Sequence, residues 1–259
     1  MSSRLAVILL LGAIAACDSD GNVRVSRSTG ALHYDDFSGA SINVSRWTVD
    51  TTGNGTAGSS SVTVANSQAR LALAAASGNL QASLLFPTPL VEQIGSIEAR
   101  VTPIINTETP PSIVRFRMFI RPYKDDKYVS AGGTDLTSDV FAQLRHRAGN
   151  FEALISRCVD SACASEVILP VTSLGPAPLL QAYDVKLSWN GGTLFSFSVA
   201  GISSTSFDAS GGGPFAKIGA SGQPRAKVEV IADSGAPTAG SSTADVDFVN
   251  CARWGGGSC

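Results

Sequence analysis

The chain has 259 residues, and its composition is typical of a secreted protein rich in β-structure. Charged residues make up 15%, against the usual quarter, while glycine, serine, threonine, alanine and valine are abundant. The 19 basic and 21 acidic residues give a net charge of −2. Because no basic patch is present, the charge pattern argues against a nucleic-acid partner.

The N-terminus has the order of a secretory signal peptide. Arg4 precedes an apolar run at residues 5–11, and small residues follow. This run is too short to cross a bilayer as a conventional helix. The letters I-A-A-C at 14–17 resemble the bacterial lipobox, whose cysteine is acylated and becomes the new N-terminus. We expect residues 1–16 to be a lipoprotein signal peptide and Cys17 to carry the lipid; an ordinary signal peptide with an accidental cysteine is the alternative.

Residues 17–30 predict a tether between the lipid and the folded part. They are polar and lack hydrophobic periodicity, which favours a flexible segment. Acylation would supply at least two chains, enough for stable membrane anchoring. Cleavage after residue 16 removes Arg4 and leaves 18 basic residues against 21 acidic ones, a net charge of −3. We expect a lipid-anchored protein of the bacterial cell envelope, periplasmic or surface-facing.

Four further cysteines fit an oxidising compartment: Cys158, Cys163, Cys251 and Cys259. Four cysteines allow three pairings. We prefer the two local bridges, Cys158 with Cys163 and Cys251 with Cys259, because each pair closes a short polar or glycine-rich loop. A zinc site is the alternative, but this spacing, with two histidines in the chain, is poor for zinc.

The rest of the chain predicts one all-β domain over residues 31–253, followed by a glycine-rich tail at 254–259. Runs with a period of two recur between turn residues. They are 61–65, 69–74, 80–86, 96–101, 113–120, 127–131, 140–147, 151–157, 165–171, 183–189, 194–200, 226–232 and 244–249. Hairpin turns are indicated at 148–150 and 190–192. More than a dozen short strands favour two packed antiparallel sheets.

Four segments, in order, carry a resemblance to a known family. They are D-D-F-S-G-A-S-I-N-V-S-R-W at 35–47, Q-L-R-H-R-A-G-N-F-E-A at 143–153, A-Y-D-V-K-L-S-W-N-G-G-T-L-F-S-F-S-V-A-G at 182–201 and D-V-D-F-V at 245–249. Together they resemble concanavalin A-like lectin/glucanase domains of the LamG-like jelly-roll type. The resemblance implies an antiparallel two-sheet jelly-roll sandwich.

The tryptophans are expected to serve the fold. We expect Trp47, with Phe37, to anchor the first segment onto the core, since each buries a large apolar area. Trp189 alternates with Val185 and Leu187, which favours an inward position over a sugar platform. Trp254 lies between Cys251 and Cys259, where packing is preferred over ligand binding.

Glycoside hydrolysis is not supported by the carboxylate pattern. A retaining hydrolase needs two carboxylates about 5 Å apart. The laminarinase-like hydrolases of this fold carry them on one strand as E-x-D-x-E or E-x-D-x-x-E, and neither pattern occurs here. Asp245 and Asp247 come nearest, but they lie on the presumed closing strand and lack the glutamate. We therefore assign no catalytic residue and lean toward a protein that is not an enzyme.

A polysaccharide lyase is the alternative enzyme. Jelly-roll lyases use a Tyr or His near the scissile sugar, with Arg and Gln to neutralise the uronate. One predicted strand carries cationic and amide side chains on one face, and a second predicted strand could add two more arginines. The candidate ligand-binding residues are Arg115, Arg117, Gln143, Arg145 and Arg147, with His146 on the opposite face. We prefer the plainer interpretation that these arginines face solvent and deter edge pairing.

The resemblance also implies a structural calcium ion, at Asp36 and Asp247. Calcium prefers several oxygen ligands, including carboxylates. We prefer the alternative in which both aspartates are exposed or cap turns, so no cofactor is assigned with certainty.

Three functions remain open after the sequence alone. The first is a non-catalytic module that binds a glycan or another extracellular polymer. The second is a polysaccharide lyase or hydrolase with a non-standard site. The third is a structural or adhesion lipoprotein that binds protein. A fold does not decide among them.

Overall fold

The computed structural model describes residues 33–54, 58–76, 78–87, 94–108, 114–129, 135–158, 166–168, 171–208, 225–232, 239–253 and 255–259. They belong to the second of two compact units, His33–Cys259. The predicted signal peptide, Cys17 and the tether lie outside the described residues, as do Cys163, Trp254 and the side chain of Cys158. Among the described residues, no helix is long and apolar enough to span a membrane.

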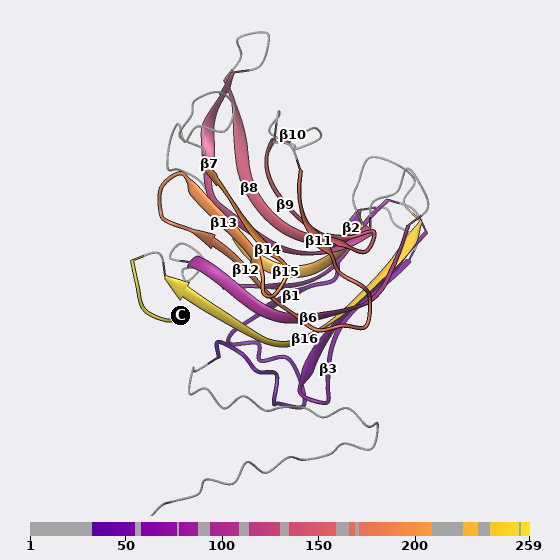
Figure 1. Ribbon diagram of the computed structural model, residues 1–259. Helices are drawn as coiled ribbons and strands as arrows, with labels where there is room; N and C mark the ends of the chain where they lie inside the picture. The colour runs from indigo at the N-terminus through magenta and orange to yellow at the C-terminus, as the bar shows by residue number, and fades with distance from the viewer. Residues whose placement is uncertain are drawn as a thin grey trace, which may run out of the picture. The chain divides into compact units, whose positions relative to one another are not determined.

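The described chain forms two antiparallel sheets (Figure 1). The larger, nine-stranded sheet contains, in spatial order, β1 (Thr48–Asp50), β5 (Asn79–Leu85), β15 (Arg225–Ala232), β7 (Val114–Val129), β8 (Asp135–Arg147), β9 (Asn150–Cys158) and β10 (Glu166–Ile168). In the same sheet, β2 (Gly53–Asn54) pairs with β5, and β11 (Thr172–Pro176) pairs with β9. Figure 1 shows β7, β8 and β9 side by side, curving together.

The seven-stranded sheet completes the sandwich. Its order is β14 (Ser203–Asp208), β13 (Leu194–Val199), β12 (Tyr183–Trp189), β6 (Ile94–Glu108), β16 (Gly240–Arg253), β4 (Gln68–Ala75) and β3 (Gly58–Ala65). The predicted fold class, an all-β two-sheet jelly-roll sandwich of the concanavalin A-like type, is confirmed.

Most predicted strands are present, with differences at irregular places. The segment 127–131, expected as a separate strand, belongs to β7, which continues to Val129 across two register shifts against β8. The strands β1, β2, β11 and β14 were not predicted. β14 reads S-S-T-S-F-D and has too few apolar residues for a clear alternation, yet it pairs with β13 along its whole length.

The core lies between the sheets and follows the two-residue alternation. Val114, Phe116 and Met118 on β7 are buried in it, while the residues between them point to the other side of the sheet. The predicted core positions of Phe37, Trp47 and Trp189 are confirmed.

A tight turn and a disulfide fix the chain at the ends of strands. Residues 148 and 149 form a two-residue turn between β8 and β9, with positive φ angles of 47° and 76°. At the C-terminus, Cys251 and Cys259 form the local disulfide that the sequence analysis preferred. An isolated antiparallel β-bridge between Ala252 and Ser258 lies next to it. The predicted glycine-rich tail is thereby tied back to β16.

Candidate functional site

A row of polar residues crosses the nine-stranded sheet at right angles to its strands. Five neighbouring strands each contribute one residue, and each residue lies directly opposite the next across the pairing register. We call this set the transverse row; it consists of Ser83, Glu229, Arg117, Arg145 and Glu152. Neighbouring strands are about 4.8 Å apart, so the row extends over about 19 Å. All five side chains point away from the core, because the flanking residues of each strand face it.

Glu229 is the most deeply buried charge in the row. Arg117 donates to one of its carboxylate oxygens through Nε. Ser83 Oγ donates to the other oxygen at 2.7 Å, and Lys227 Nζ lies 2.7 Å from the same atom. Burial by itself raises the pKa of Glu229, but the charges of Arg117 and Lys227 outweigh it and hold the pKa at about 2. This carboxylate is therefore ionised at neutral pH.

Two arginines meet at the centre of the row. Arg117 and Arg145 lie opposite each other on β7 and β8, an arrangement of like charges that is unfavourable on its own. A carboxylate on each outer side compensates: Arg145 Nε donates to Glu152 at 2.7 Å, as Arg117 does to Glu229.

Gln143 lies beside this centre. Its Oε1 accepts a hydrogen bond of 3.1 Å from Nη1 of Arg117. One residue pair further along the strands, Phe119 faces Gln143 across β7 and β8. The guanidinium of Arg117 and the ammonium of Lys227 lie 5.1 and 5.3 Å from the ring centroid of Phe119, close enough for cation–π attraction.

The structure changes the preferred interpretation of the arginines. Arg115, Arg117 and Arg145 are at most 8% exposed, so they do not face solvent. Their strands, β7 and β8, each have a neighbour on both sides, so there is no edge for these side chains to protect. A role in solubility or edge protection is therefore wrong for these three residues.

Arg147 and His146 lie apart from the row. Arg147 is directed to Glu108 at the end of β6, with 3.1 Å between Nη2 and Oε1. His146 is buried on the core side, as expected, where Nε2 lies 2.8 Å from the carbonyl oxygen of Ala177. Burial lowers the pKa of His146, which favours the neutral imidazole. His33 is also remote, since it stacks on Phe248 at 4.4 Å.

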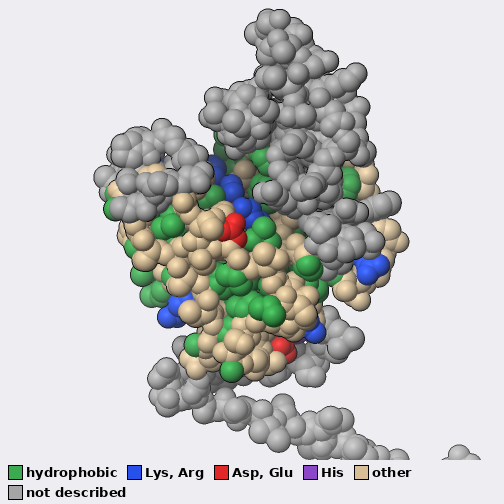
Figure 2. All heavy atoms as spheres, turned by 180° about the vertical axis from the view of Figure 1, so that it is seen from behind, with side chains coloured by type: hydrophobic (Ala, Val, Ile, Leu, Met, Phe, Trp, Pro, Cys, Tyr) green, Lys and Arg blue, Asp and Glu red, His purple; other side chains and the backbone are tan. Residues whose placement is uncertain are grey.

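The molecule is hollowed on the side that carries charged side chains. Figure 2 shows basic and acidic side chains meeting within a hollow, seen from behind relative to Figure 1.

The chemistry of the row suits binding better than hydrolysis. Glu229 and Glu152 are three strand spacings apart, about 14 Å, whereas hydrolase carboxylates lie about 5 to 9.5 Å apart. Glu229 is also held ionised, so it cannot act as a general acid near neutral pH. A lyase base is not present among the described side chains of this face, which include neither tyrosine nor histidine. Tyr123 and Tyr128 lie on β7, and their side chains are outside the described part of the chain.

The two aspartates considered as calcium ligands form hydrogen bonds with different partners. The hydroxyl of Ser38 and, to a smaller extent, its backbone N–H donate hydrogen bonds to Asp36 and lower the pKa of this carboxyl group. Asp247 accepts a hydrogen bond from Gln68. Within the described ranges, no group of three or more His, Cys, Asp or Glu side chains is arranged to hold a metal ion. Calcium binding at these residues stays a prediction from the sequence.

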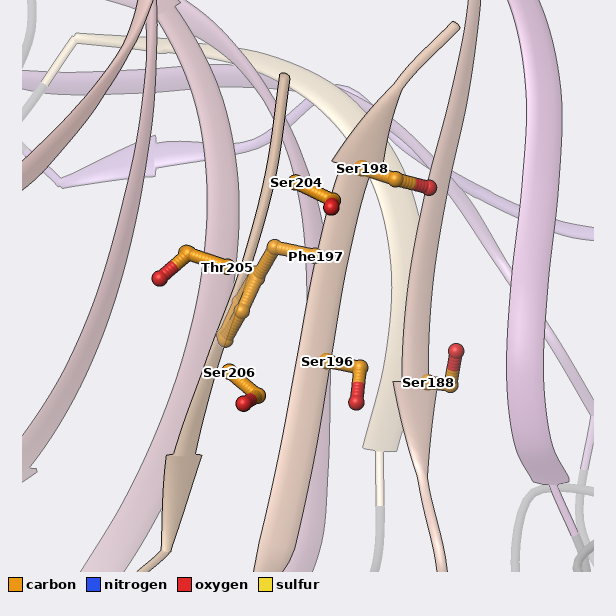
Figure 3. A pocket seen from close by; sticks show the side chains of 7 residues that line it. All are labelled: Ser188, Ser196, Phe197, Ser198, Ser204, Thr205 and Ser206. Carbon is orange, nitrogen blue, oxygen red and sulfur yellow. The ribbon is translucent and has the colours of Figure 1, made fainter.

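A second concave surface lies on the seven-stranded sheet. Hydroxyl-bearing residues of β12, β13 and β14 line a shallow cavity of about 380 Å³ (Figure 3). Its lining consists of Ser188, Ser196, Phe197, Ser198, Ser204, Thr205 and Ser206. The cavity lacks a charged side chain and is open, so it offers weak and unselective hydrogen bonding.

The comparisons with known proteins agree with the fold. No family model matches the chain, and no curated protein matches it. A solved structure reported for endo-acting O-glycanases of the human gut microbiota, which initiate mucin breakdown, is 11% identical with a TM-score of 0.50 and covers 83% of this chain and 95% of its own. An alginate lyase from Pseudomonas aeruginosa is 13% identical (TM-score 0.48; 82% and 100% covered). An endo-1,3-beta-glucanase from Streptomyces sioyaensis is 14% identical (TM-score 0.46; 83% and 92% covered). At these identities the similarity shows the fold alone.

The sequence analysis found the cationic half of the row and missed the acidic half. Glu152 and Glu229 lie on different strands, β9 and β15, so a search for carboxylates along single strands does not join them to the arginines. Lys227 and Ser83 were not singled out. A search across paired strands would have found them, but it requires the strand order of the sheet.

Proposed function

We propose that this chain is a lipid-anchored envelope protein whose jelly roll binds an acidic extracellular polysaccharide without cleaving it. The transverse row is the binding site. The arginine pair Arg117 and Arg145 receives an anionic group of the polymer, and Gln143 supplies an amide beside it. The lipid anchor at Cys17 holds the protein at the membrane.

The observation that carries this proposal is the pair of opposed guanidinium groups, Arg117 and Arg145, at the centre of the row. Arg117 and Arg145 lie directly opposite each other on β7 and β8, so an anionic group placed between them would relieve the repulsion of their like charges. Planar guanidinium groups bind carboxylates and sulfates through paired hydrogen bonds. A neutral glycan offers no charged group to these two arginines.

The test is a binding panel with the full-length protein in detergent solution. The panel contains a polyuronate, a sulfated polysaccharide and a neutral β-glucan, each measured with calcium and with a chelator. The same samples are assayed for new reducing ends and unsaturated ends. We expect saturable binding of an acidic polymer, weaker in high salt, without product. Equal binding of the neutral glucan, or binding of none, would contradict the proposal.

Matched variants locate the site. Arg145→Gln removes one central cation and should weaken binding of the acidic polymer about tenfold, the usual effect of losing a charged hydrogen bond. Arg70→Gln is the control, because Arg70 forms a comparable pair with Asp245 on the other sheet. It makes the same charge change and should leave binding unaltered. Equal losses in both variants would indicate a nonspecific charge effect.

A polysaccharide lyase is the second candidate. It is favoured by the contact between Arg117 and Gln143 beside Arg145, since these groups can neutralise a uronate carboxylate. Release of unsaturated ends in the panel would establish it in place of the non-catalytic function. The base would then be sought at Tyr123 and Tyr128, by conversion of each to Phe.

A further inference from the structure

The face that carries the transverse row becomes apolar further along the strands. Phe119, Phe141 and Leu154 are each at most 8% exposed, although they point away from the core. The two phenylalanines form a cluster of their own, separate from the core, with 5.2 Å between ring centroids. We call these three residues the apolar flank. The apolar flank lies on the same face as the buried charges of the row, and its residues are not part of the hydrophobic core between the sheets.

A single hydroxyl lies in this apolar surrounding. Ser156 is fully buried and directly opposite Phe141 in the pairing of β8 and β9. It shares the face of Leu154, because their common neighbour Ile155 faces the core. In the part of the chain that the structure describes, Ser156 Oγ has no hydrogen-bond partner. Buried hydroxyls are nearly always paired, since an unpaired one is costly, so this one calls for an explanation.

An acyl group would satisfy both features. Its carbonyl oxygen can accept a hydrogen bond from Ser156 Oγ, and its methyl group can pack against Phe141 and Phe119. A bare sugar hydroxyl could also pair with Ser156, but the remaining polar edge of the sugar would be desolvated against the phenylalanine rings. The combination of one donor with apolar walls therefore selects a carbonyl-bearing apolar substituent.

We infer that the apolar flank and Ser156 form a subsite for an acetyl ester or acetyl amide on the polysaccharide. This inference rests on the proposed binding of an acidic polymer at the transverse row. Ser156 and Glu152 are four residues apart on β9, which corresponds to about 14 Å. This distance exceeds one sugar ring, so the acetyl group and the acid group belong to different sugars of one chain. The polysaccharide runs along β8 and β9.

Two matched pairs of polymers test the inference with the full-length protein. The first pair is O-acetylated bacterial alginate and the same sample after mild alkaline deacetylation. The second pair is hyaluronan, which carries N-acetyl groups, and its N-deacetylated form. We expect the acetylated member of one pair to bind about tenfold more tightly than its partner, the effect of one added hydrogen bond and a packed methyl group. A preference within the first pair indicates an ester. A preference within the second pair indicates an amide only where Ser156→Ala removes it, because N-deacetylation also adds positive charge to the polymer.

Ser156→Ala assigns the preference to this subsite. It should abolish the preference and leave binding of the deacetylated polymer unchanged, without a loss of fold, because no internal hydrogen bond is removed. Phe141→Leu retains apolar volume and should reduce the preference. Ser196→Ala, on the seven-stranded sheet, is the control that should change neither binding value.

The outcomes separate this inference from the proposed function. Equal binding within both pairs overturns the acetyl subsite while the proposed function stands. A preference that persists in Ser156→Ala also overturns it, because the acetyl group then binds elsewhere. Binding of none of the four polymers contradicts the proposed function itself, and the subsite with it.

Discussion

Glu229 is a carboxylate whose charge is maintained inside the protein by its neighbours. It has no exposed side-chain surface, yet Arg117, Lys227 and Ser83 all contact it. Removing one partner of such a group leaves the others buried without compensation, which costs more than the pair itself contributes. The energetic importance of Glu229 is therefore larger than that of an exposed ion pair such as Arg70–Asp245.

We predict that Glu229→Gln destabilises the protein by about 3 to 5 kcal/mol, because two buried cations lose their counter-charge. Chemical denaturation at neutral pH measures the change. Asp245→Asn, which breaks the more exposed pair with Arg70, is the matched control and should cost about 1 kcal/mol or less. Equal losses in the two variants would show that burial does not govern the effect.

The lowered pKa of Glu229 makes the stability of the protein depend on pH. The pKa of Glu229 is about 2 in the folded state, below its ordinary value of 4.5, so its contribution is present above pH 4.5 and is lost as the pH falls toward 2. The difference corresponds to about 3 kcal/mol. Denaturation curves between pH 6 and 2 should show this loss in the wild type and its absence in Glu229→Gln. Parallel pH profiles would contradict it.

Trp47 gives a second residue-scale prediction. Its Nε1 donates to Asp35 at 2.7 Å in the buried first segment, whereas Nε1 of Trp189 donates to the carbonyl of Gly192 at 2.8 Å. Trp47→Phe should therefore cost about 2 kcal/mol from the lost bond to a carboxylate, and Trp189→Phe about 1 kcal/mol. Thermal and chemical denaturation of both variants measures the difference. A larger loss at Trp189 would reverse the assignment.

At the scale of elements, alternation along a strand could be predicted from the sequence, but pairing between strands could not. The shared face of Gln143 and Arg145 follows from their spacing of two, and the opposite face of His146 follows equally. Glu229 joins Arg117 only because β15 pairs with β7, although 112 residues separate them in sequence. The burial of Arg117 and Arg145 could not be predicted either. It depends on the central position of β7 and β8 in the sheet, which follows from the strand order.

In the turn between β8 and β9, the first residue is not of the type that its backbone conformation favours. Ala148 and Gly149 both have positive φ, the conformation of the two-residue turn in which Asn-Gly is preferred. Ala148→Asn should stabilise the hairpin by about 0.5 to 1 kcal/mol, and Gly149→Ala should destabilise it by about 1 kcal/mol. A Cβ at Gly149 would meet no atom within 4 Å, so the loss reports the backbone alone. Denaturation midpoints measure both; a gain in the second variant would refute the turn type.

At the scale of the whole molecule, the proposed binding site depends on the pairing of strands that are distant in sequence. The core lies between the sheets, whereas the transverse row lies on the far side of the nine-stranded sheet, held in place by β5, β15, β7, β8 and β9 together. Since the row exists only when these five strands are paired, the unfolded chain cannot present it. A ligand of the row must therefore bind the folded state and stabilise it.

This coupling gives a prediction for the intact protein. A polyuronate at one hundred times its dissociation constant should raise the free energy of unfolding by about 2.7 kcal/mol. The increase should shrink as salt is added, because screening weakens the attraction between the polymer and the arginine pair. Thermal unfolding with and without polymer, at low and high salt, measures it in the wild type and in Arg145→Gln. At the same polymer concentration the variant should gain clearly less, since its dissociation constant is larger. An equal increase in the variant, or one insensitive to salt, would place the polymer away from the transverse row.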